Sequence, residues 1–301
     1  MFLGEMEGAR MALVSVVMAN YNGEQFLDSA VESILTQTYE DLELVIVDDG
    51  STDGSRDIVA RHARRDRRVR AVLLDHCGLV KALNHGCGLA AADFIARLDS
   101  DDIAKSDRLS KQLTYMLSNP DIALVGGAVE CIDVRGNTLF IMNWPSQRDG
   151  LHDYLLSDCH VSHTTVLFRK HVFWKIGGYR LAYADAEDYD LFLRMSDHHL
   201  VDNLPDVLCQ YRLHANQISA CRGWQQVISG IAARLATRAR RSNRAEPRWK
   251  GDVVSRDDLI AAGIKPERVD SLIREYSENA SYSAGWRWAK KKFCELPNYI
   301  V

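Results

Sequence analysis

The chain lacks paired cysteines, and it has no apolar run of membrane-spanning length. Its seven cysteines stand singly at 77, 87, 131, 159, 209, 221 and 294, without a CxxC pair. Scattered cysteines in odd number fit the free thiols of a reducing cytoplasm better than a disulfide framework. No apolar stretch reaches the roughly 18 residues that a spanning helix needs. The acidic opening MFLGEMEGAR does not fit a secretory signal, and we interpret residues 1–11 as an N-terminal extension.

The chain also lacks a strong excess of charge of one sign. Its formal net charge is −4 and its pI is about 6.2, which argues against a dedicated nucleic-acid binder. The average conceals an asymmetry, because residues 222–301 carry 16 Lys and Arg against 9 Asp and Glu, whereas residues 1–221 carry 21 against 32. An acidic body is thus followed by a basic C-terminal region. With 301 residues, the chain can form one large domain with an appendage.

Apolar, β-branched runs alternate with helical patterns over the first part of the chain. Such alternation predicts an α/β fold, in which helices cover both faces of a mostly parallel central sheet. Beyond about residue 215 the strand signals stop and Arg-rich helical sequence takes over, so we place a domain boundary at 219/220. The expected strands are 13–19, 42–47, 69–74, 94–98, 122–134, 164–168 and 207–213, and the expected helices are 24–38, 53–66, 79–92, 107–118 and one that begins at Glu187.

Polar clusters follow three of the expected strands directly. Asn20-Tyr21-Asn22-Gly23 follows the first strand, Asp48-Asp49-Gly50-Ser51 the second, and Asp99-Ser100-Asp101-Asp102 the fourth. In open parallel sheets, ligands bind at the carboxyl ends of the strands. We therefore expect the three clusters to lie on one edge of the sheet and to form a binding site.

The acidic cluster at 99–102 has a spacing that suits a metal site. One residue separates Asp99 from Asp101, so both carboxylates can face the same side of an extended segment. Hard cations such as Mg²⁺ and Mn²⁺ prefer carboxylate oxygens, and a divalent cation can neutralise a diphosphate leaving group. The alternative is that these acids only cap a loop and a helix. The two interpretations have even weight until the position on the sheet edge is considered, which favours the metal site.

Two further acidic pairs have both a functional and a structural interpretation. Asp48 and Asp49 can accept a hydrogen bond from a base N–H, or they can form a turn; two acids followed by Ser-Thr-Asp exceed what a turn needs. Glu187 and Asp188 can take a proton from an acceptor hydroxyl, or they can complement the positive end of a helix. From the residues alone, the structural interpretation is preferred for this second pair.

At this point an ordered set of segments resembles the family 2 glycosyltransferases, which are inverting enzymes with the GT-A fold, many of them in bacterial surface-polysaccharide synthesis. No single segment is decisive, but their order and spacing together are specific. The resemblance covers roughly residues 12–219, and the C-terminal region lies outside it. The segments are VSVVMANYNGEQFLDSAVESILTQTYEDLELVIVDDGSTDGS, GLVKALNHGCGLAAADFIARLDSDDIAKSDRLSKQL, HTTVLFRK, GGY, AEDYDLFLRM and YRLHANQIS.

The resemblance implies which residues contact a nucleotide-sugar donor. The segment after the first strand would touch the nucleoside, an acid after the second strand would hold the base, and later residues would line or close over the diphosphate. The donor itself is expected to be a UDP-sugar. The expected donor contacts are Ala19, Tyr21, Glu24, Asp48, Asp49, Lys81, Asn84, Arg97, Asp99, Ser100, Arg212 and His214.

The resemblance also implies a metal site and a general base. Asp99 and Asp101 match the DXD motif that holds Mn²⁺ or Mg²⁺ in the family. Glu187-Asp188 matches the ED motif, whose aspartate is usually the base, so Asp188 is the expected base and the resemblance reverses the preference stated above. The expected reaction moves a sugar to a glycan or lipid-linked acceptor hydroxyl with inversion. Family members often carry Asn in place of His76 and His-Pro-Thr in place of His163-Thr164-Thr165, so the resemblance does not specify the sugar.

Other function classes fit the sequence less well. A dinucleotide-dependent oxidoreductase would show GxGxxG after the first strand, and Asn20-Tyr21-Asn22-Gly23 does not supply it. A nucleotidyltransferase would more naturally carry a glycine-rich basic loop at that place. The nucleotidyltransferase and a non-catalytic nucleotide-sugar-binding module are therefore kept as the alternatives.

The basic region 220–301 has two interpretations. An apolar stripe along 224–241, with arginines near its end and Trp286 and Trp288 further on, is typical of a basic amphipathic helix that lies on an anionic membrane surface. The alternative is a helical cap that packs on the catalytic domain, and this is preferred. The expected location is accordingly the cytoplasm, with peripheral contact to the inner face of the membrane as the open question. Assembly with a second copy of the chain stays open.

Overall fold

The computed structural model describes residues 14–146, 151–157, 159–217 and 221–278. The predicted N-terminal extension 1–11 lies outside these residues, as do Trp286 and Trp288. Along the first part of the chain, strands and helices alternate as expected. The elements are β1 (Val14–Asn20), α1 (Leu27–Leu35), β2 (Leu42–Asp49), α2 (Ser55–Arg65), β3 (Val69–Leu74), α3 (Leu79–Leu89) and β4 (Phe94–Arg97).

The rest of the chain has shorter and more varied elements. The elements are β5 (Ile103–Ala104), α4 (Arg108–Ser118), β6 (Ile122–Ile132), β7 (Thr138–Met142), α5 (Leu151–Tyr154), η2 (His163–Thr165), β8 (Leu167–Arg169), α6 (Lys170–Lys175), η3 (Leu181–Tyr183), α7 (Glu187–Ser196), β9 (Leu200–Arg212), α9 (Gly223–Arg241), α10 (Arg256–Ala261) and α11 (Pro266–Glu278). The expected strand over 164–168 is wrong at its start, where η2 forms a turn. β9 begins at Leu200 rather than at 207, and the periodicity did not predict β7 or α6.

One nine-stranded mixed sheet organises the molecule. Its strand order is β3-β2-β1-β4-β8-β6-β9-β5, and β7 pairs with β6. Strands β3, β2, β1 and β4 are mutually parallel. The short strand β8 runs antiparallel to both β4 and β6, and β6 is parallel to β9. The prediction of an α/β fold with a mostly parallel sheet is confirmed.

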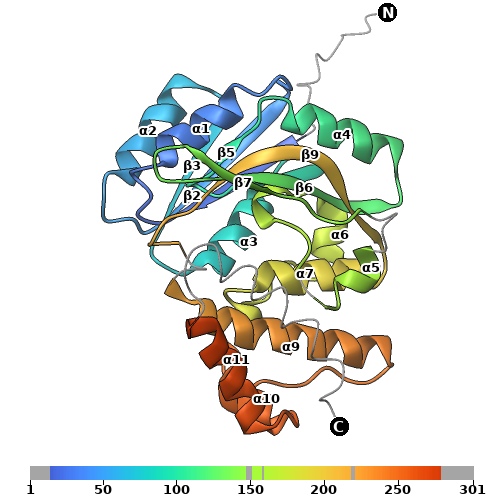
Figure 1. Ribbon diagram of the computed structural model, residues 1–301. Helices are drawn as coiled ribbons and strands as arrows, with labels where there is room; N and C mark the ends of the chain where they lie inside the picture. Colours follow the sequence, from blue (N-terminus) through green and yellow to red (C-terminus); the bar gives the residue numbers. More distant parts are fainter. Residues whose placement is uncertain (1–13, 147–150, 158, 218–220, 279–301) are drawn as a thin grey trace, which may run out of the picture.

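Helices cover both faces of the sheet (Figure 1). Val16 and Met18 of β1 share an apolar cluster with α1, α2 and α4, while Val17 lies in the cluster on the opposite face. Successive side chains of a strand point to opposite faces, and here both faces are buried, which explains the continuous apolar runs. Helices α9, α10 and α11 form a further layer below α7 in Figure 1.

The C-terminal helices pack on the body of the molecule. Apolar residues of α9, among them Ile228 and Ile231, share one cluster with Leu83 of α3 and Phe192 of α7. The region after 220 is therefore helical where it is described, in agreement with the predicted appendage, and its long helix is buried against α7. Whether it is a separate domain stays a prediction.

Candidate active site

The carboxyl ends of β1 and β2 are joined by hydrogen bonds between side chains. The Asn20 amide donates to Asp48 Oδ2 at 3.0 Å, and the Ser51 backbone N–H donates to Asp48 Oδ1 at 3.0 Å. The Arg56 guanidinium donates to the same carboxylate at 3.0 Å. Asp48 is fully buried, and these bonds hold its pKa below the ordinary value in spite of burial. Asp48 therefore links the loop after β1 to the loop after β2. The polar clusters at these two strand ends lie on one edge of the sheet, as predicted.

Asp49 lies beside an exposed pair of rings. Its carboxylate accepts hydrogen bonds from the backbone N–H groups of Cys77 and Gly78, at 2.7 and 2.9 Å. His76 Nδ1 lies 3.0 Å from Asp49 Oδ2, and the imidazole is 4.4 Å from the Tyr21 ring, centroid to centroid. Both rings are open to solvent, with Tyr21 49% exposed and the His76 side chain 58% exposed. The two rings are tilted by 32° against each other, and their exposed faces offer aromatic surface on which a planar base can stack.

Side chains of the protein already contact the acidic loop after β4. Both terminal nitrogens of Arg97 donate to the carboxylate of Asp99. His214 Nε2 lies 2.8 Å from Asp101 Oδ2. The buried carboxylate of Asp102 accepts from the Arg212 backbone N–H at 2.8 Å, while its other oxygen has no hydrogen-bond partner among the described residues.

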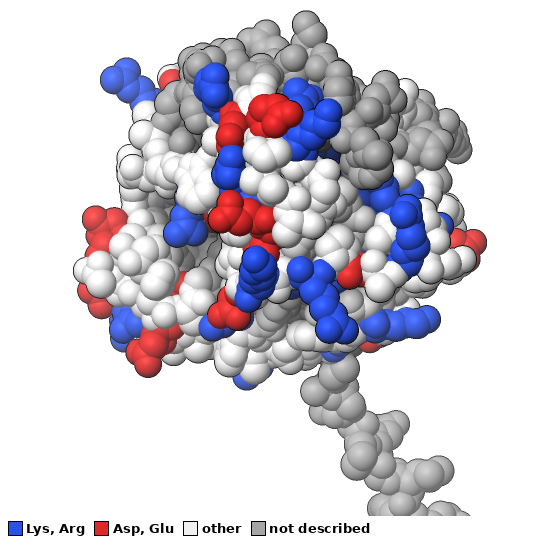
Figure 2. All heavy atoms as spheres, turned by 90° about the horizontal axis from the view of Figure 1, so that it is seen from below, with Lys and Arg blue, Asp and Glu red and all other residues white. Residues whose placement is uncertain are grey.

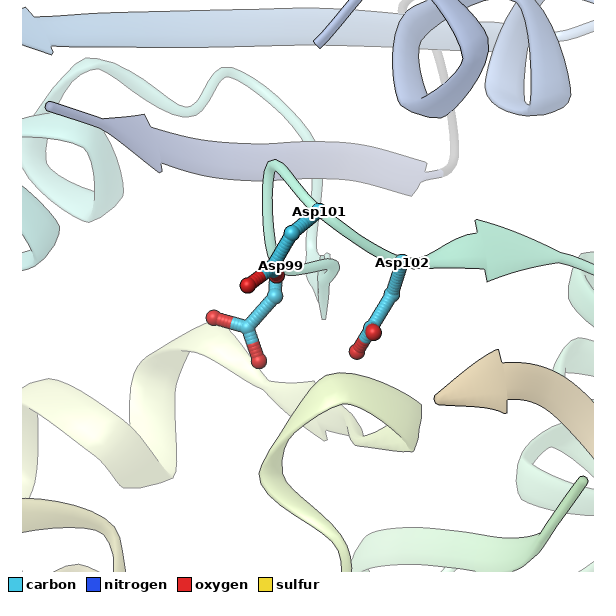
Figure 3. A group of neighbouring side chains, drawn as sticks. All are labelled: Asp99, Asp101 and Asp102. Atoms are coloured by element: carbon cyan, nitrogen blue, oxygen red, sulfur yellow. The ribbon is translucent and has the colours of Figure 1, made fainter. Parts of the chain in front are cut away.

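The three carboxylates of this loop suit a divalent cation. Figure 3 shows their side chains turned to the same side of the loop. One oxygen each from Asp99, Asp101 and Asp102 lies within 4.8 Å of the others, and burial together with mutual repulsion raises the pKa of Asp99 and of Asp102. A hard cation held by Asp99 and Asp101 would relieve that repulsion, so the donor set fits Mg²⁺ or Mn²⁺.

A buried arginine fixes the backbone next to this loop. Arg108 of α4 is fully buried and donates to the carbonyl oxygens of Arg97 and Val166, at 2.7 and 3.2 Å. Its Nε donates to Gln112 Oε1 at 3.0 Å, and Gln112 in turn donates to the Thr165 carbonyl at 2.7 Å. Because these bonds fix the backbone at the end of β4, they set the direction in which Asp99 leaves the strand.

Glu187 and Asp188 open α7 opposite the acidic loop. Burial and repulsion from Asp188 raise the pKa of Glu187 to about 8, and burial raises the pKa of Asp188 to about 6. Glu187 Oε2 is buried and has no hydrogen-bond partner among the described residues. Near neutral pH this pair therefore holds one neutral and one ionised carboxyl group, which is the arrangement that a general base needs.

One pocket contains both acidic groups. It is formed by the end of β4, the loop before η2, the start of α7 and the start of α9, and it brings together the predicted metal ligands and the predicted base. Sequence reasoning gave no site role to Ser162, Asp185 and Gln226, which lie outside the recognised segments, nor to His163, Thr164, Tyr211 and Gln217, which lie inside them. The lining residues are Leu79, Arg97, Asp99, Asp101, Met142, Ser162, His163, Thr164, Asp185, Glu187, Asp188, Tyr211, Gln217 and Gln226.

Several predicted donor contacts lie outside this pocket and have structural partners. The Asn84 amide is bonded at both ends to the backbone of Tyr179, at 2.8 and 3.0 Å. The Arg212 side chain donates to the Asp101 carbonyl at 2.9 Å and lies over the Phe26 ring. The Glu24 carboxylate accepts from the Gly54 backbone N–H at 2.6 Å. These residues shape the loops around the site, and their contact with a donor stays a prediction.

The remaining predicted contacts lie along the same edge. Ala19 is half-buried near the end of β1, Lys81 is exposed on α3, and Ser100 is half-buried in the acidic loop. Ser100 Oγ would lie 3.3 Å from a methyl group added at Gly23, which shows that the acidic loop approaches the loop after β1 closely. The loop after β1, which is assigned to the nucleoside, and the acidic loop, which is assigned to the diphosphate, are therefore neighbours.

The structure does not leave the apolar face of α9 free for a membrane. Val227, Ile228 and Ile231 are at most 3% exposed. Arg240 and Arg241 pair with Asp197 at 2.7 and 2.8 Å. On the face of the molecule seen in Figure 2, acidic and basic side chains of the described residues lie side by side. Within the described residues, none of the helices is long and apolar enough to cross a bilayer. The packing of α9 supports the cap interpretation over these residues, while Trp224 at the start of the same stripe is 50% exposed, so peripheral contact with a membrane stays a prediction.

Comparison with known proteins establishes the family. The profile described as "Glycosyl transferase family 2" matches residues 15–177, which is more than half of the chain. The protein belongs to glycosyl transferase family 2 and is a glycosyltransferase. This membership decides against the oxidoreductase and the nucleotidyltransferase.

Named relatives and a solved structure agree with this membership. The amylovoran biosynthesis glycosyltransferase AmsE of Erwinia amylovora is 35% identical over 73% of this chain and 83% of its own length. The UDP-Glc:alpha-D-GlcNAc-diphosphoundecaprenol beta-1,3-glucosyltransferase WfgD of Escherichia coli is 29% identical over 69% of this chain and 80% of its own. The mannosyltransferase PcManGT of Pyrobaculum calidifontis, solved with GDP-Man and Mn²⁺, superposes with a TM-score of 0.61 and 19% identity, over 94% of this chain and 85% of that one. The last comparison confirms the GT-A type of fold.

Proposed function

We propose that the protein transfers a sugar from a UDP-sugar to a hydroxyl group of a glycan or lipid-linked acceptor, with inversion at the anomeric carbon. The observation that carries the proposal is the single pocket in which Asp188 faces the acidic loop of Asp99 and Asp101. A donor held at the acidic loop presents its anomeric carbon to the space in front of α7. Direct displacement there needs one base, and inversion follows because the acceptor attacks from the side opposite to the leaving diphosphate.

Asp188 is the base in this proposal. Its carboxylate is half-buried, its Oδ1 accepts the Tyr189 backbone N–H at 2.7 Å, and its pKa of about 6 makes it ionised yet still basic at neutral pH. A base with a pKa near the operating pH is the most effective proton acceptor. Glu187, with a pKa of about 8, stays protonated and does not compete for the acceptor proton.

Asp99 and Asp101 would hold a divalent cation, with Asp101 the more direct ligand and Asp102 supporting the loop. Bound there, Mg²⁺ or Mn²⁺ would neutralise charge on the departing diphosphate. Arg97 lies in the same pocket, almost fully buried, and its guanidinium is already oriented by Asp99. A positive group at this place adds electrostatic stabilisation to the leaving group without reorganisation.

The base of the donor is assigned to the Tyr21–His76 ring pair and Asp49. Asp49 is preferred over Asp48, because Asp48 is fully buried and saturated by Asn20, Ser51 and Arg56. The names of relatives support the donor and acceptor classes, since WfgD is named for a UDP-sugar donor and a diphosphoundecaprenol-linked acceptor.

A thermal-shift screen of nucleotide-sugars with and without Mn²⁺ tests this function. Ligands that bind only the folded state raise its stability by mass action, so the expected result is a UDP-sugar whose stabilisation depends on the metal. Guanosine and cytidine nucleotide-sugars serve as matched controls for the base. If no nucleotide-sugar has a metal-dependent effect, the proposed donor and metal are wrong. If a nucleotide-sugar then still binds without metal, the result favours the non-catalytic alternative.

A further inference from the structure

The pocket contains an aspartate that the proposed chemistry does not use. Asp185 lies in the loop before α7, lines the pocket, and has a side chain only 7% exposed. Its sole ion pair among the described residues is a long one, 3.4 Å from Arg222, whose own side chain is 66% exposed. Burial accordingly raises the pKa of Asp185. A buried carboxylate with so weak a partner is open to hydrogen-bond donors from a ligand.

The backbone holds Asp185 in an unusual conformation. Its φ is +68°, in the left-handed region that residues other than glycine rarely adopt. The C-terminal region keeps the preceding residues in place, because the Ser229 hydroxyl donates to the Ala184 carbonyl at 2.8 Å and the Val254 N–H donates to the Ala182 carbonyl at 2.9 Å. Backbone conformations of this kind persist where surrounding structure fixes them, and they are frequent at functional sites.

Asp185 shares the pocket with the two acids that open α7. All three carboxyl groups belong to residues that line it, and repulsion from Asp188 and from Asp185 contributes to the raised pKa of Glu187. Asp185 therefore lies close to the proposed base along the chain and in the same pocket.

The acceptor hydroxyl has to reach Asp188 from the side away from the diphosphate. Asp185, three residues before Asp188 and in the same pocket, is placed to contact the rest of the acceptor sugar. Gln226 of α9, one helical turn after the ion-pair partner Arg222, and Tyr211 of β9 also line the pocket. A carboxylate accepts hydrogen bonds from two neighbouring hydroxyls, a glutamine amide both donates and accepts, and an aromatic ring packs on the apolar face of a sugar.

We infer that Asp185, together with Gln226 of α9, forms the acceptor-recognition wall and binds adjacent hydroxyl groups of a neutral sugar ring. This inference rests on the proposed function and deepens it, since it assigns residues to the acceptor rather than to the donor. It also gives the C-terminal region a role in the reaction: α9 contributes Gln226 to the pocket and fixes the loop that carries Asp185.

The test uses the full chain and two variants that separate recognition from structure. Asp185→Asn removes the charge and keeps a residue that tolerates positive φ. Arg222→Gln removes the ion-pair partner and leaves the carboxylate. Each protein is measured for transfer to a panel of alkyl glycosides, for hydrolysis of the donor by water, and for melting temperature. Asp57→Asn, on the exposed side of α2, is the matched control.

For Asp185→Asn we expect the ratio of transfer to donor hydrolysis to fall by about tenfold or more, through KM for the glycoside, because a charge-assisted hydrogen bond is lost. Arg222→Gln should change that ratio by less than about threefold, as expected for an exposed ion pair. Saturation-transfer NMR with UDP and Mg²⁺ present should detect a bound alkyl glycoside in the wild type and a weaker signal in Asp185→Asn.

Three outcomes would overturn the inference. The ratio in Asp185→Asn could equal that of the wild type, or Arg222→Gln could lower the ratio and the melting temperature as much as Asp185→Asn, which would make the aspartate a structural ion-pair partner. The third is a wild type that hydrolyses the donor but binds none of the glycosides. A wild type that neither binds nor hydrolyses any donor contradicts the proposed function instead, so the two failures are distinguishable.

Discussion

The donor and acceptor sides of the site are built differently. On the donor side, the two acids at the end of β2 already have protein partners: Asp48 is held by Asn20 and Arg56, and Asp49 by two backbone N–H groups. On the acceptor side, Glu187 Oε2 has no partner among the described residues and Asp185 has only a distant one. The protein itself fixes the acids expected near the base, whereas the acceptor side, like Asp102 Oδ2 in the acidic loop, leaves polar atoms without a partner among the described residues.

This difference indicates which side of the site the fold fixes and which side can vary between substrates. Parallel strands fix the starts of the donor loops by backbone pairing, for example Asn20 opposite Asp48. The acceptor wall is assembled from a loop, the start of α7 and a helix outside the matched family segment. One scaffold can therefore keep a common donor chemistry while the acceptor wall changes, in line with the general placement of function on loops.

The largest expected effect is on the acceptor side, at the base. Asp188→Asn should lower the rate of transfer about 10²–10⁴-fold, because proton removal from the attacking hydroxyl is lost. Donor affinity, measured by calorimetry, should stay within the error of the wild-type value. Turnover near that of the wild type, with donor binding intact, would show that another group takes the proton.

The next effect concerns the donor side. Asp101→Asn should abolish the stabilisation that a UDP-sugar and Mn²⁺ confer together, and it should lower transfer by about 10²-fold or more, as when a charge-stabilising group is removed. Asp102→Asn is the matched variant, since its side chain keeps an acceptor for the Arg212 N–H. Chelation with EDTA should reproduce the Asp101 result in the wild type. Equal effects of both variants would contradict the preference for Asp101 as the direct ligand.

A smaller effect is expected where the two halves meet, at the turn before η3. Gly178 has φ +64°, and a methyl group there would lie 2.8 Å from Asn84 Oδ1. Gly177 also has positive φ, +88°, but open space around the added group. Gly178→Ala should therefore lower stability by about 1–3 kcal/mol, and more than Gly177→Ala does. Denaturant unfolding of both variants checks this, and equal losses would contradict a close approach of Asn84.

The pH dependence should distinguish the members of the α7 pair. Asp188 must be ionised to act, so kcat/KM should fall about tenfold per unit as the pH is lowered below about 6. Glu187 has a folded-state pKa of about 8, above its ordinary 4.5, so the folded state binds the extra proton between these values. Stability should then decrease as the pH rises from about 4.5 to 8, and Glu187→Gln should reduce that slope. Melting curves in EDTA measure it, and identical slopes would contradict a buried neutral Glu187.

The sequence predicts the donor half well because its signals are local. Continuous apolar runs identify β1, β2 and β4, and the parallel-sheet rule then brings their polar ends together. The spacing and position of Asp99 and Asp101 favour them as the proposed metal ligands. The motif that contains Asp188 is recognisable only by resemblance, because two acids at the start of a helix are also ordinary helix chemistry.

The acceptor half was less predictable for physical reasons. Strand β8 has only three residues, too few for a periodic signal, and η2 forms from residues that also suit a strand. Asp185 enters the pocket through a positive φ and through contacts with α9, and neither leaves a pattern in the sequence around it. Asn84 and Arg212 were expected to contact the donor, but their polar groups bind the Tyr179 backbone and the Asp101 carbonyl.

The buried Arg108 couples folding stability to the placement of the acidic loop. It donates to the carbonyl oxygens of Arg97 and Val166, at 2.7 and 3.2 Å, and to Gln112 Oε1 at 3.0 Å. An apolar side chain of similar size would leave these buried acceptors without a donor, and each one left unsatisfied costs about 1–3 kcal/mol. A substitution at this position is therefore expected to lower stability and to misdirect the acidic loop at the same time.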